Sequence, residues 1–217
     1  MNLGSSRSRA VKRLMDLVLT VPVLIVSLPV QAIVAIAVKI SSPGPALYRA
    51  RRVGRNGREF TMFKFRSMRV GLDGPRVTGA SDGRITPVGR FLRRTKFDEL
   101  PQLAQVVVGQ MSLVGRRPED PRYVALYTQD QRRVFKVPPA ITGPAMEVDE
   151  EARLAGLAPE DVERVYVEEL MPAKLEVELS YLDSWSPVGD LRILVATLLS
   201  LLPHFRSRHR PNPAYDG

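Results

Sequence analysis

The sequence contains no cysteine and only two histidines among its 217 residues. The absence of cysteine excludes disulfides, thiolate nucleophiles and thiolate zinc sites. His204 and His209 both belong to a basic C-terminal segment, which disfavours a Ser-His-Asp triad and a multi-histidine metal site. Any enzymatic chemistry in this chain would therefore depend on carboxylates, lysine, arginine and a hard metal ion.

Acidic residues are the minority, 23 against 32 lysines and arginines, and the net charge is +9. Residues 147–169 hold nine acids and two arginines, a net charge of −7, so the rest of the chain carries +16. We expect this acidic stretch to form a solvated helix. The basic remainder favours polyanionic partners such as nucleic acid, anionic lipid or phosphorylated substrates. Because no nucleic-acid-binding motif is present, nucleic acid is not an expected partner.

Charge is nearly absent from residues 14–38, where Asp16 is the one charged residue and Gln31 the one amide. A helix of 25 residues rises ~37 Å, which exceeds the ~30 Å of a hydrocarbon core. The segment contains Pro22 and Pro29. Proline lacks a backbone donor and clashes with the preceding turn, so we predict a membrane helix bent at Pro29.

Basic residues flank this apolar segment at both ends: Arg7, Arg9, Lys12 and Arg13 before it, and Lys39, Arg49, Arg51 and Arg52 after it. The positive-inside rule places both flanks in the cytoplasm, and a helix that enters one leaflet and returns satisfies both. An uncleaved signal anchor, a signal peptide cleaved near "AIA" (35–37) and a buried soluble helix are the alternatives. The apolar run is longer than the usual signal-peptide core of about 7–15 residues.

A second apolar segment, residues 191–205, is too short to span a bilayer and precedes the basic "RSRHR". A helix lying in the membrane interface and an ordinary core helix explain it equally well. Trp185, just ahead of it, stands where an interfacial anchor is favoured.

An Asn56-Gly57 pair separates two alternating runs and predicts a β-hairpin with strands at 47–53 and 58–65. Residues 49–69 hold eight basic residues against the single acid Glu59, which suits either a solvated face or a surface for phosphates and lipid headgroups. Residues 70–83 are rich in glycine, predict a flexible loop and match no nucleotide-triphosphate motif.

The stretch "KFDELPQL" (96–103) places Asp98 and Glu99 behind five cations: Arg84, Arg90, Arg93, Arg94 and Lys96. Apolar residues recur at helical spacing from position 100, with Thr95 or Asp98 as the candidate cap, so the two acids belong at a helix start. One interpretation is a helix cap with a salt bridge to Arg93 or Arg94. The other is a phosphate-handling site that combines a carboxylate nucleophile, a Mg²⁺ ligand and cationic clamps.

Several motifs occur in an order that resembles the bacterial sugar transferases, the monotopic phosphoglycosyl transferases that initiate glycan assembly. The motifs are "KRLMD" (12–16), "SSPGPALYRARRVGRNGREFTMFKFRSM" (41–68), "RITPVGRFLRRTKFDELPQL" (84–103), "GQMSLVGRRPE" (109–119), "ITG" (141–143) and "WSPVGDLRIL" (185–194). The sequence departs from the family pattern at Arg116, where proline is usual, at Met146, where glutamine is usual, and at Leu28 before Pro29.

The resemblance implies transfer of a sugar 1-phosphate from a UDP-sugar to polyprenol phosphate, such as undecaprenyl phosphate, with release of UMP. Asp98 would attack the β-phosphorus and Glu99 would hold Mg²⁺. The candidates for binding substrate phosphates are Lys64, Arg66, Arg90, Arg94 and Arg117. Each of these residues also has a purely structural interpretation. Lys64 and Arg66 would lie on a solvated strand face, Arg117 would be a turn residue, and Asp190 would be a helix cap.

The expected fold class is α+β, with a bent re-entrant helix, a β-hairpin packed on helices and interfacial amphipathic helices. Residues 1–40 would form the basic tail and membrane helix, and residues 41–217 the catalytic domain on the cytoplasmic face of the bacterial inner membrane. A homodimer is compatible with the sequence, which carries no signal for oligomeric state. A polybasic membrane-tethered adaptor, a membrane-bound nucleic-acid binder and a diphosphate hydrolase are the rival functions.

Overall fold

The computed structural model describes residues 3, 5–71, 82–148, 153–154 and 157–201. Its helices and strands, in chain order, are α1 (Ser6–Ser41), β1 (Leu47–Val53), β2 (Glu59–Phe65), α2 (Pro87–Thr95), α3 (Gln102–Val107), β3 (Ser112–Val114), α4 (Pro121–Val124), β4 (Ala140–Thr142), α6 (Pro159–Val165), α7 (Met171–Ser184) and α8 (Pro187–Ser200). Antiparallel β1–β2 and parallel β3–β4 form two small sheets among the helices, which confirms the α+β class. The expected loop at 70–83 lies mostly outside the described residues.

The predicted hairpin is confirmed. Leu47 pairs with Phe65 at one end and Val53 with Glu59 at the other. Asn56 and Gly57 both adopt positive φ, 58° and 73°, which these two residue types tolerate at low cost. The turn chemistry therefore sets the register that brings Lys64 onto β2.

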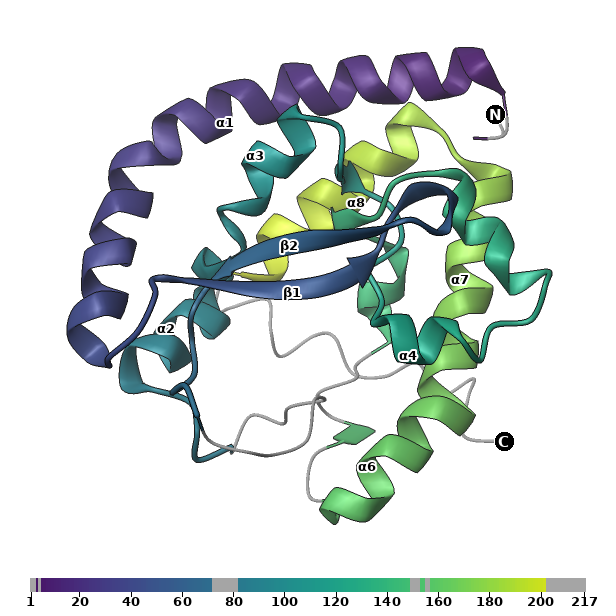
Figure 1. Cartoon of the computed structure of the whole chain (residues 1–217). Helices are drawn as coiled ribbons and strands as arrows, with labels where there is room; N and C mark the ends of the chain where they lie inside the picture. The colour runs from purple at the N-terminus through teal and green to yellow at the C-terminus, as the bar shows by residue number, and fades with distance from the viewer. Residues whose placement is uncertain (1–2, 4, 72–81, 149–152, 155–156, 202–217) are drawn as a thin grey trace.

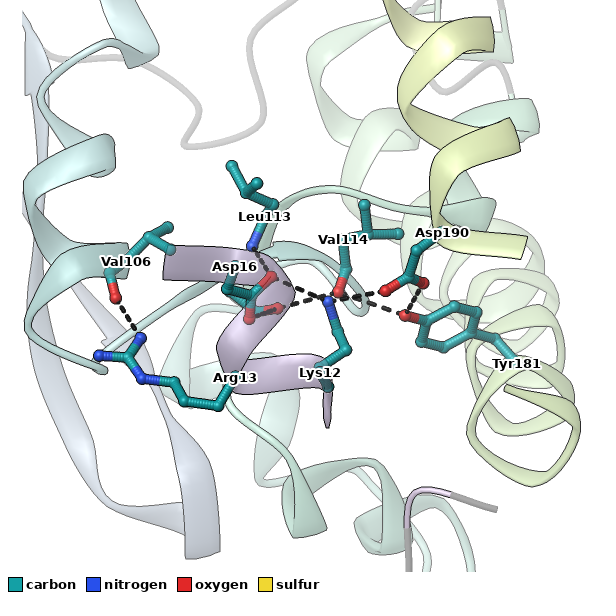
Figure 2. A network of polar contacts seen from close by, with 9 residues as sticks. Lys12, Arg13, Asp16, Val106, Leu113, Val114, Tyr181 and Asp190 are labelled. Atoms are coloured by element: carbon teal, nitrogen blue, oxygen red, sulfur yellow. Dashed lines mark hydrogen bonds and ion pairs between the residues drawn. The ribbon is translucent and has the colours of Figure 1, made fainter. Parts of the chain in front are cut away.

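The first half of α1 is anchored to the domain by a polar stripe (Figure 2). Lys12 forms ion pairs with Asp16 at 3.1 Å and with Asp190 of α8 at 2.9 Å. Asp16 also accepts hydrogen bonds from the Ser112 hydroxyl at 2.7 Å and the Leu113 amide at 3.1 Å. All three charged groups are buried. Asp190 does not cap α8, because Ser186 accepts the hydrogen bond from the Gly189 amide.

The second half of α1 is anchored at its C-terminus. Val34 and Val38 pack against Phe65 and Leu92. The buried guanidinium of Arg66 donates to the carbonyls of Val38 at 3.3 Å, Ser42 at 2.6 Å and Pro43 at 2.5 Å. Carbonyls at a helix end lack intrahelical partners, so Arg66 stabilises the exit of α1 rather than lying with the other candidate phosphate ligands.

Between these anchors, α1 exposes apolar side chains such as Ile25, Val26 and Ile33, which are 61%, 77% and 66% exposed. Within the described part of the chain, α1 is the one helix long and apolar enough to cross a membrane. Figure 1 shows that α1 runs along one side of the domain and then turns down an adjacent side. Pro22 and Pro29 both lie inside the helix.

The C-terminal part of the structure corrects two expectations. Trp185 is only 1% exposed and packs with Leu3, Val137 and Leu182, so it is a core residue and not an interfacial anchor. Tyr166, within the acidic stretch, is also buried in a core cluster, so that stretch is amphipathic rather than solvated throughout. Helix α8 exposes apolar side chains, including Val195 and Leu198, while the basic tail lies outside the described residues.

Candidate active site

The Asp98-Glu99 pair lies in a short 3₁₀ turn, η2 (Phe97–Glu99), between α2 and α3. The chain leaves α2 through Lys96, whose φ of 59° turns it sharply. Neither predicted cap is present: the Thr95 hydroxyl donates back to the Phe91 carbonyl, and α3 begins without a side-chain cap. The two acids are nonetheless buried just before α3, with Asp98 6% and Glu99 8% exposed.

Glu99 is held by two cations from different parts of the chain. Its Oε1 lies 3.0 Å from Lys64 Nζ on β2 and 3.4 Å from an Arg117 guanidinium nitrogen in the turn after β3. Although burial raises the pKa of Glu99, the charges of Lys64 and Arg117 outweigh this effect and lower it to about 2. Glu99 is therefore ionised at any working pH.

Asp98 has a different environment from that of its neighbour. Its Oδ1 is buried and has no hydrogen-bond partner among the described residues. Burial raises the pKa of Asp98, and the charge of Lys64 opposes this only in part. An unpartnered buried carboxylate oxygen is costly in a structural role, which makes Asp98 the candidate for direct chemistry.

A polar cavity of about 240 Å³ opens beside this turn. Its lining includes the cations Arg52, Lys64, Arg93, Arg117 and Lys174, the acids Glu99, Glu119 and Asp120, and the aromatic side chains Tyr123 and Tyr166. Asp98 is adjacent in sequence to Glu99 but does not itself line the cavity. A cavity with five cationic side chains can accept a ligand that carries several phosphates.

The structure separates the predicted phosphate ligands into two groups. Lys64 and Arg117 meet at Glu99 and line the cavity. Arg90 and Arg94 are on the exposed face of α2 and do not line it, whereas Arg93 on the same helix does. Arg66 lies at the end of α1, as described above.

The turn that presents Arg117 is fixed by buried charges that sequence reasoning missed. The Arg116 guanidinium donates to the Val53 carbonyl at 3.0 Å and lies over the Phe135 ring at 4.7 Å. Burial lowers the pKa of Arg116 to about 10. The Arg117 amide donates to Glu178 of α7 at 2.9 Å. Lys174 and Glu178, four residues apart on α7, are both buried, and no local sequence pattern marks them as buried.

Glu178 is itself strongly perturbed. Burial raises the pKa of Glu178 to about 7, even though the Arg117 amide and the charges of Arg116 and Lys174 favour its ionised form. Its carboxyl group accepts a hydrogen bond from the Arg117 backbone amide and does not line the cavity. We therefore assign it to holding the Arg117 turn and not to contact with a ligand.

The sequence model of a family described as bacterial sugar transferase matches residues 7–204. The chain is 38% identical over 203 residues to the UDP-glucose:undecaprenyl-phosphate glucose-1-phosphate transferase of Escherichia coli strain K12, covering 89% of this chain and 40% of that protein. It is 40% identical over 198 residues to the enzyme of the same name from Xanthomonas campestris pv. campestris, covering 88% of this chain and 38% of that protein.

A third relative of the same name, from Caulobacter vibrioides, is 38% identical over 197 residues, covering 88% of this chain and 69% of that protein. The chain thus spans about 40% of the length of the first two relatives and most of the length of the third.

Proposed function

The chain belongs to the bacterial sugar transferase family, and from this premise we propose that it transfers a sugar 1-phosphate from a UDP-sugar to polyprenol phosphate and releases UMP. The observation that carries the proposal is the contrast between two adjacent carboxylates. Glu99 is neutralised by Lys64 and Arg117, whereas the buried Asp98 Oδ1 has no partner among the described residues. Relatives named for this reaction support the substrate classes.

In the first step, an Asp98 carboxylate oxygen attacks the β-phosphorus of the UDP-sugar. A bond forms between that oxygen and phosphorus, the bond from phosphorus to the bridging oxygen breaks, and UMP departs with the electron pair. Lys64, Arg93 and Arg117 line the cavity, where they would bind the diphosphate and stabilise the charge that develops on the leaving oxygen. In the second step, an oxygen of polyprenol phosphate attacks the same phosphorus and frees the Asp98 carboxylate.

The residues present fit a Mg²⁺ ion that is shared with substrate. Glu99 is ionised because Lys64 and Arg117 keep its pKa low, and it lies in the cavity wall. Within the described ranges, no group of three or more His, Cys, Asp or Glu side chains forms a metal site by itself. Mg²⁺ commonly binds through one or two carboxylates plus substrate phosphates. Bound there through Glu99, it would neutralise charge on the diphosphate.

The membrane arrangement follows from where α1 is anchored. Lys12 near its start pairs with Asp190, and Val38 near its end accepts from Arg66, so both ends contact the same domain. Between these contacts α1 turns from one side of the domain to an adjacent side (Figure 1), and Pro22 and Pro29 lie within it. We therefore propose a monotopic protein whose bent α1 enters one leaflet, with the cavity at the cytoplasmic face of the inner membrane.

Release of UMP tests the proposed function. Purified protein in nanodiscs would receive a panel of UDP-sugars, Mg²⁺ and undecaprenyl phosphate, alongside Asp98→Asn and the control Asp183→Asn, which alters an exposed carboxylate on α7. We expect lipid-dependent release from the wild type and from Asp183→Asn, and none from Asp98→Asn. Steady release without lipid phosphate would indicate a diphosphate hydrolase, and no release with any donor would favour the adaptor.

A further inference from the structure

Gln102, the first residue of α3, carries a buried hydrogen-bond donor that has no partner. The residue lines the polar cavity and is only 2% exposed. Its Nε2 is enclosed and makes no hydrogen bond to any described residue. An unpaired buried amide donor costs stability, so a purely structural role would not favour it. The cavity wall therefore contains a neutral donor in addition to its cations.

The backbone between Asp98 and Gln102 brings this donor close to the candidate nucleophile. After the η2 turn, Leu100 and Pro101 keep right-handed helical angles, with φ and ψ of −53° and −36° and of −59° and −22°. Residues four apart on a helical backbone are neighbours on one face. The buried Asp98 Oδ1 is also without a partner in the described part of the chain. One short segment thus holds an unpaired acceptor and an unpaired donor that do not bond to each other.

Gln105, one turn further along α3, shows what a structural glutamine does in this helix. It is also buried, but its Oε1 accepts from the Phe63 amide at 2.9 Å. Its Nε2 donates to the Thr61 carbonyl at 2.8 Å and to the Gln110 side chain at 3.0 Å. Gln105 therefore connects α3 to β2 through satisfied hydrogen bonds, and the Gln102 Nε2 takes no part in this connection.

We propose that Gln102 is a further catalytic residue, whose amide donates a hydrogen bond to an oxygen of the phosphoryl group that Asp98 receives and passes on. The inference rests on the proposed function. Preorganised donors, including glutamine amides, stabilise charge on a reacting group when water is excluded. A neutral donor suits this position, because another cation beside Asp98 would lower the pKa of the nucleophile. The nearby cations Lys64 and Arg117 are already paired with Glu99.

The same donor would act in both steps, because the same phosphorus is attacked in each. In the first step, phosphorus exchanges its bond to the UMP oxygen for a bond to the Asp98 oxygen. In the second step, it exchanges the bond to Asp98 for a bond to an oxygen of polyprenol phosphate. Gln102 forms no covalent bond and transfers no proton, so its loss should slow both steps and leave the products unchanged.

Two glutamine substitutions on α3 separate catalysis from structure. Gln102→Met and the control Gln105→Met each remove an amide and keep a side chain of similar length. Each protein is assayed for single-turnover UMP release at saturating UDP-sugar and Mg²⁺, without lipid. Intact mass then follows how fast undecaprenyl phosphate removes the sugar phosphate from the protein. Thermal midpoints are measured in parallel, and the rates are measured well below them.

We expect Gln102→Met to slow both steps by roughly a hundredfold, the usual effect of losing one such donor. Its thermal midpoint should equal or exceed that of the wild type, because an unpaired buried donor is removed. Gln105→Met should have a lower midpoint and near wild-type rates, because the partners it abandons lie in β2.

Three results would overturn the assignment. Wild-type rates in Gln102→Met would show that its amide does not act on the phosphoryl group. A midpoint lowered as in Gln105→Met, with rates reduced only in proportion to the unfolded fraction, would make Gln102 a structural residue. An absence of UMP release from the wild type would instead overturn the proposed function, and this inference with it.

Discussion

Asp98 and Glu99 are neighbours in sequence and differ in electrostatic environment. Glu99 is buried against Lys64 and Arg117, which hold its pKa at about 2. Asp98 is buried with an unpartnered Oδ1, and desolvation raises its pKa. Environments that separate the pKa values of two adjacent acids commonly assign them different roles. Here the difference suits a permanent anion for a metal ion and a separate carboxylate for covalent chemistry.

Glu178 gives the stability of the protein a pH dependence with a defined sign. Its pKa is raised from 4.5 to about 7 in the folded protein. A raised pKa means that the folded state binds the proton more tightly than the unfolded state. The stabilisation is therefore complete below about pH 4.5 and is lost as the pH rises to about 7. The groups around this carboxyl are Arg116, Lys174 and Glu119, with the Arg117 amide.

The full change is on the order of 3 kcal/mol, at 1.36 kcal/mol for each pKa unit. The thermal midpoint of the wild type should accordingly fall between pH 5 and 7 more steeply than that of Glu178→Gln, which cannot ionise. Differential scanning fluorimetry across this range, with the exposed Glu168→Gln as control, makes the comparison. Parallel pH curves for the wild type and Glu178→Gln would show that Glu178 does not titrate in this way.

Among individual residues, the sequence identified the site residues that belong to motifs of recognisable spacing. It missed the residues whose role depends on contacts distant in sequence. Asp98, Glu99, Lys64 and Arg117 belong to ordered motifs, and in the structure Glu99 pairs with Lys64 and Arg117 instead of Arg93 or Arg94. Arg66 was misplaced because nothing local indicates that its guanidinium reaches carbonyls 23–28 residues away. The sequence pattern of α7 likewise does not show which of its charged residues are buried.

Helix α1 is mostly apolar, but buried charged residues attach it to the rest of the domain. Ser8, Lys12, Asp16 and Thr20 recur every four residues and are buried, so one stripe of the helix faces the domain. In Figure 2, Lys12 lies between Asp16 and Asp190, and Tyr181 donates to Asp190 at 2.6 Å. The lone charge of the apolar segment, Asp16, is therefore structural. Asp16 connects α1 to β3, the strand that precedes the Arg117 turn, and its ion-pair partner Lys12 connects α1 to Asp190 of α8.

Removal of Lys12 should destabilise this connection strongly. Lys12→Met leaves two buried carboxylates without their shared cation, a change that typically costs about 3–5 kcal/mol. We expect a lower thermal midpoint in detergent and faster proteolysis, and partial recovery in Lys12→Met/Asp190→Asn, which also removes one of the two charges. Arg7→Met, on the exposed side of the same helix, is the control. Equal stability of Lys12→Met and Arg7→Met would show that the network does not anchor α1.

Elements with local chemical signatures were predicted well. The Asn-Gly turn located both strands of the hairpin to within one residue, because few other sequences adopt its positive φ angles. Trp185 was assigned to the membrane interface from its place in the sequence, but Leu3 and Val137, distant in sequence, enclose it. Contacts between residues distant in sequence leave no pattern in the local sequence.

At the scale of the whole molecule, the central feature is that both ends of α1 return to one domain (Figure 1). The cavity lined by Glu99 and an apolar groove formed by α1 residues with Phe97 and Leu100 both adjoin the short η2 turn. This arrangement would let a soluble nucleotide sugar and a membrane lipid approach the same carboxylate. It requires the N-terminus and the hairpin to share one face of the membrane.

Cysteine labelling tests that requirement cleanly, because the natural chain has no cysteine. Ser6→Cys and Arg55→Cys each place one thiol at an exposed position, before and after the apolar part of α1. In sealed vesicles of both orientations, an impermeant maleimide should label both thiols from the cytoplasmic face and neither from the other. Total labelling in detergent serves as the control. Labelling of the two thiols from opposite faces would show that α1 spans the membrane.

The most direct test of the account is the intact mass of the protein after incubation with its UDP-sugar and Mg²⁺ in the absence of polyprenol phosphate. We predict that the wild type gains the mass of one sugar phosphate, that undecaprenyl phosphate removes it, and that Asp98→Asn gains nothing. The same mass gain in Asp98→Asn, or lipid-dependent turnover by a wild type that forms no adduct, would contradict the assignment of Asp98 as the nucleophile.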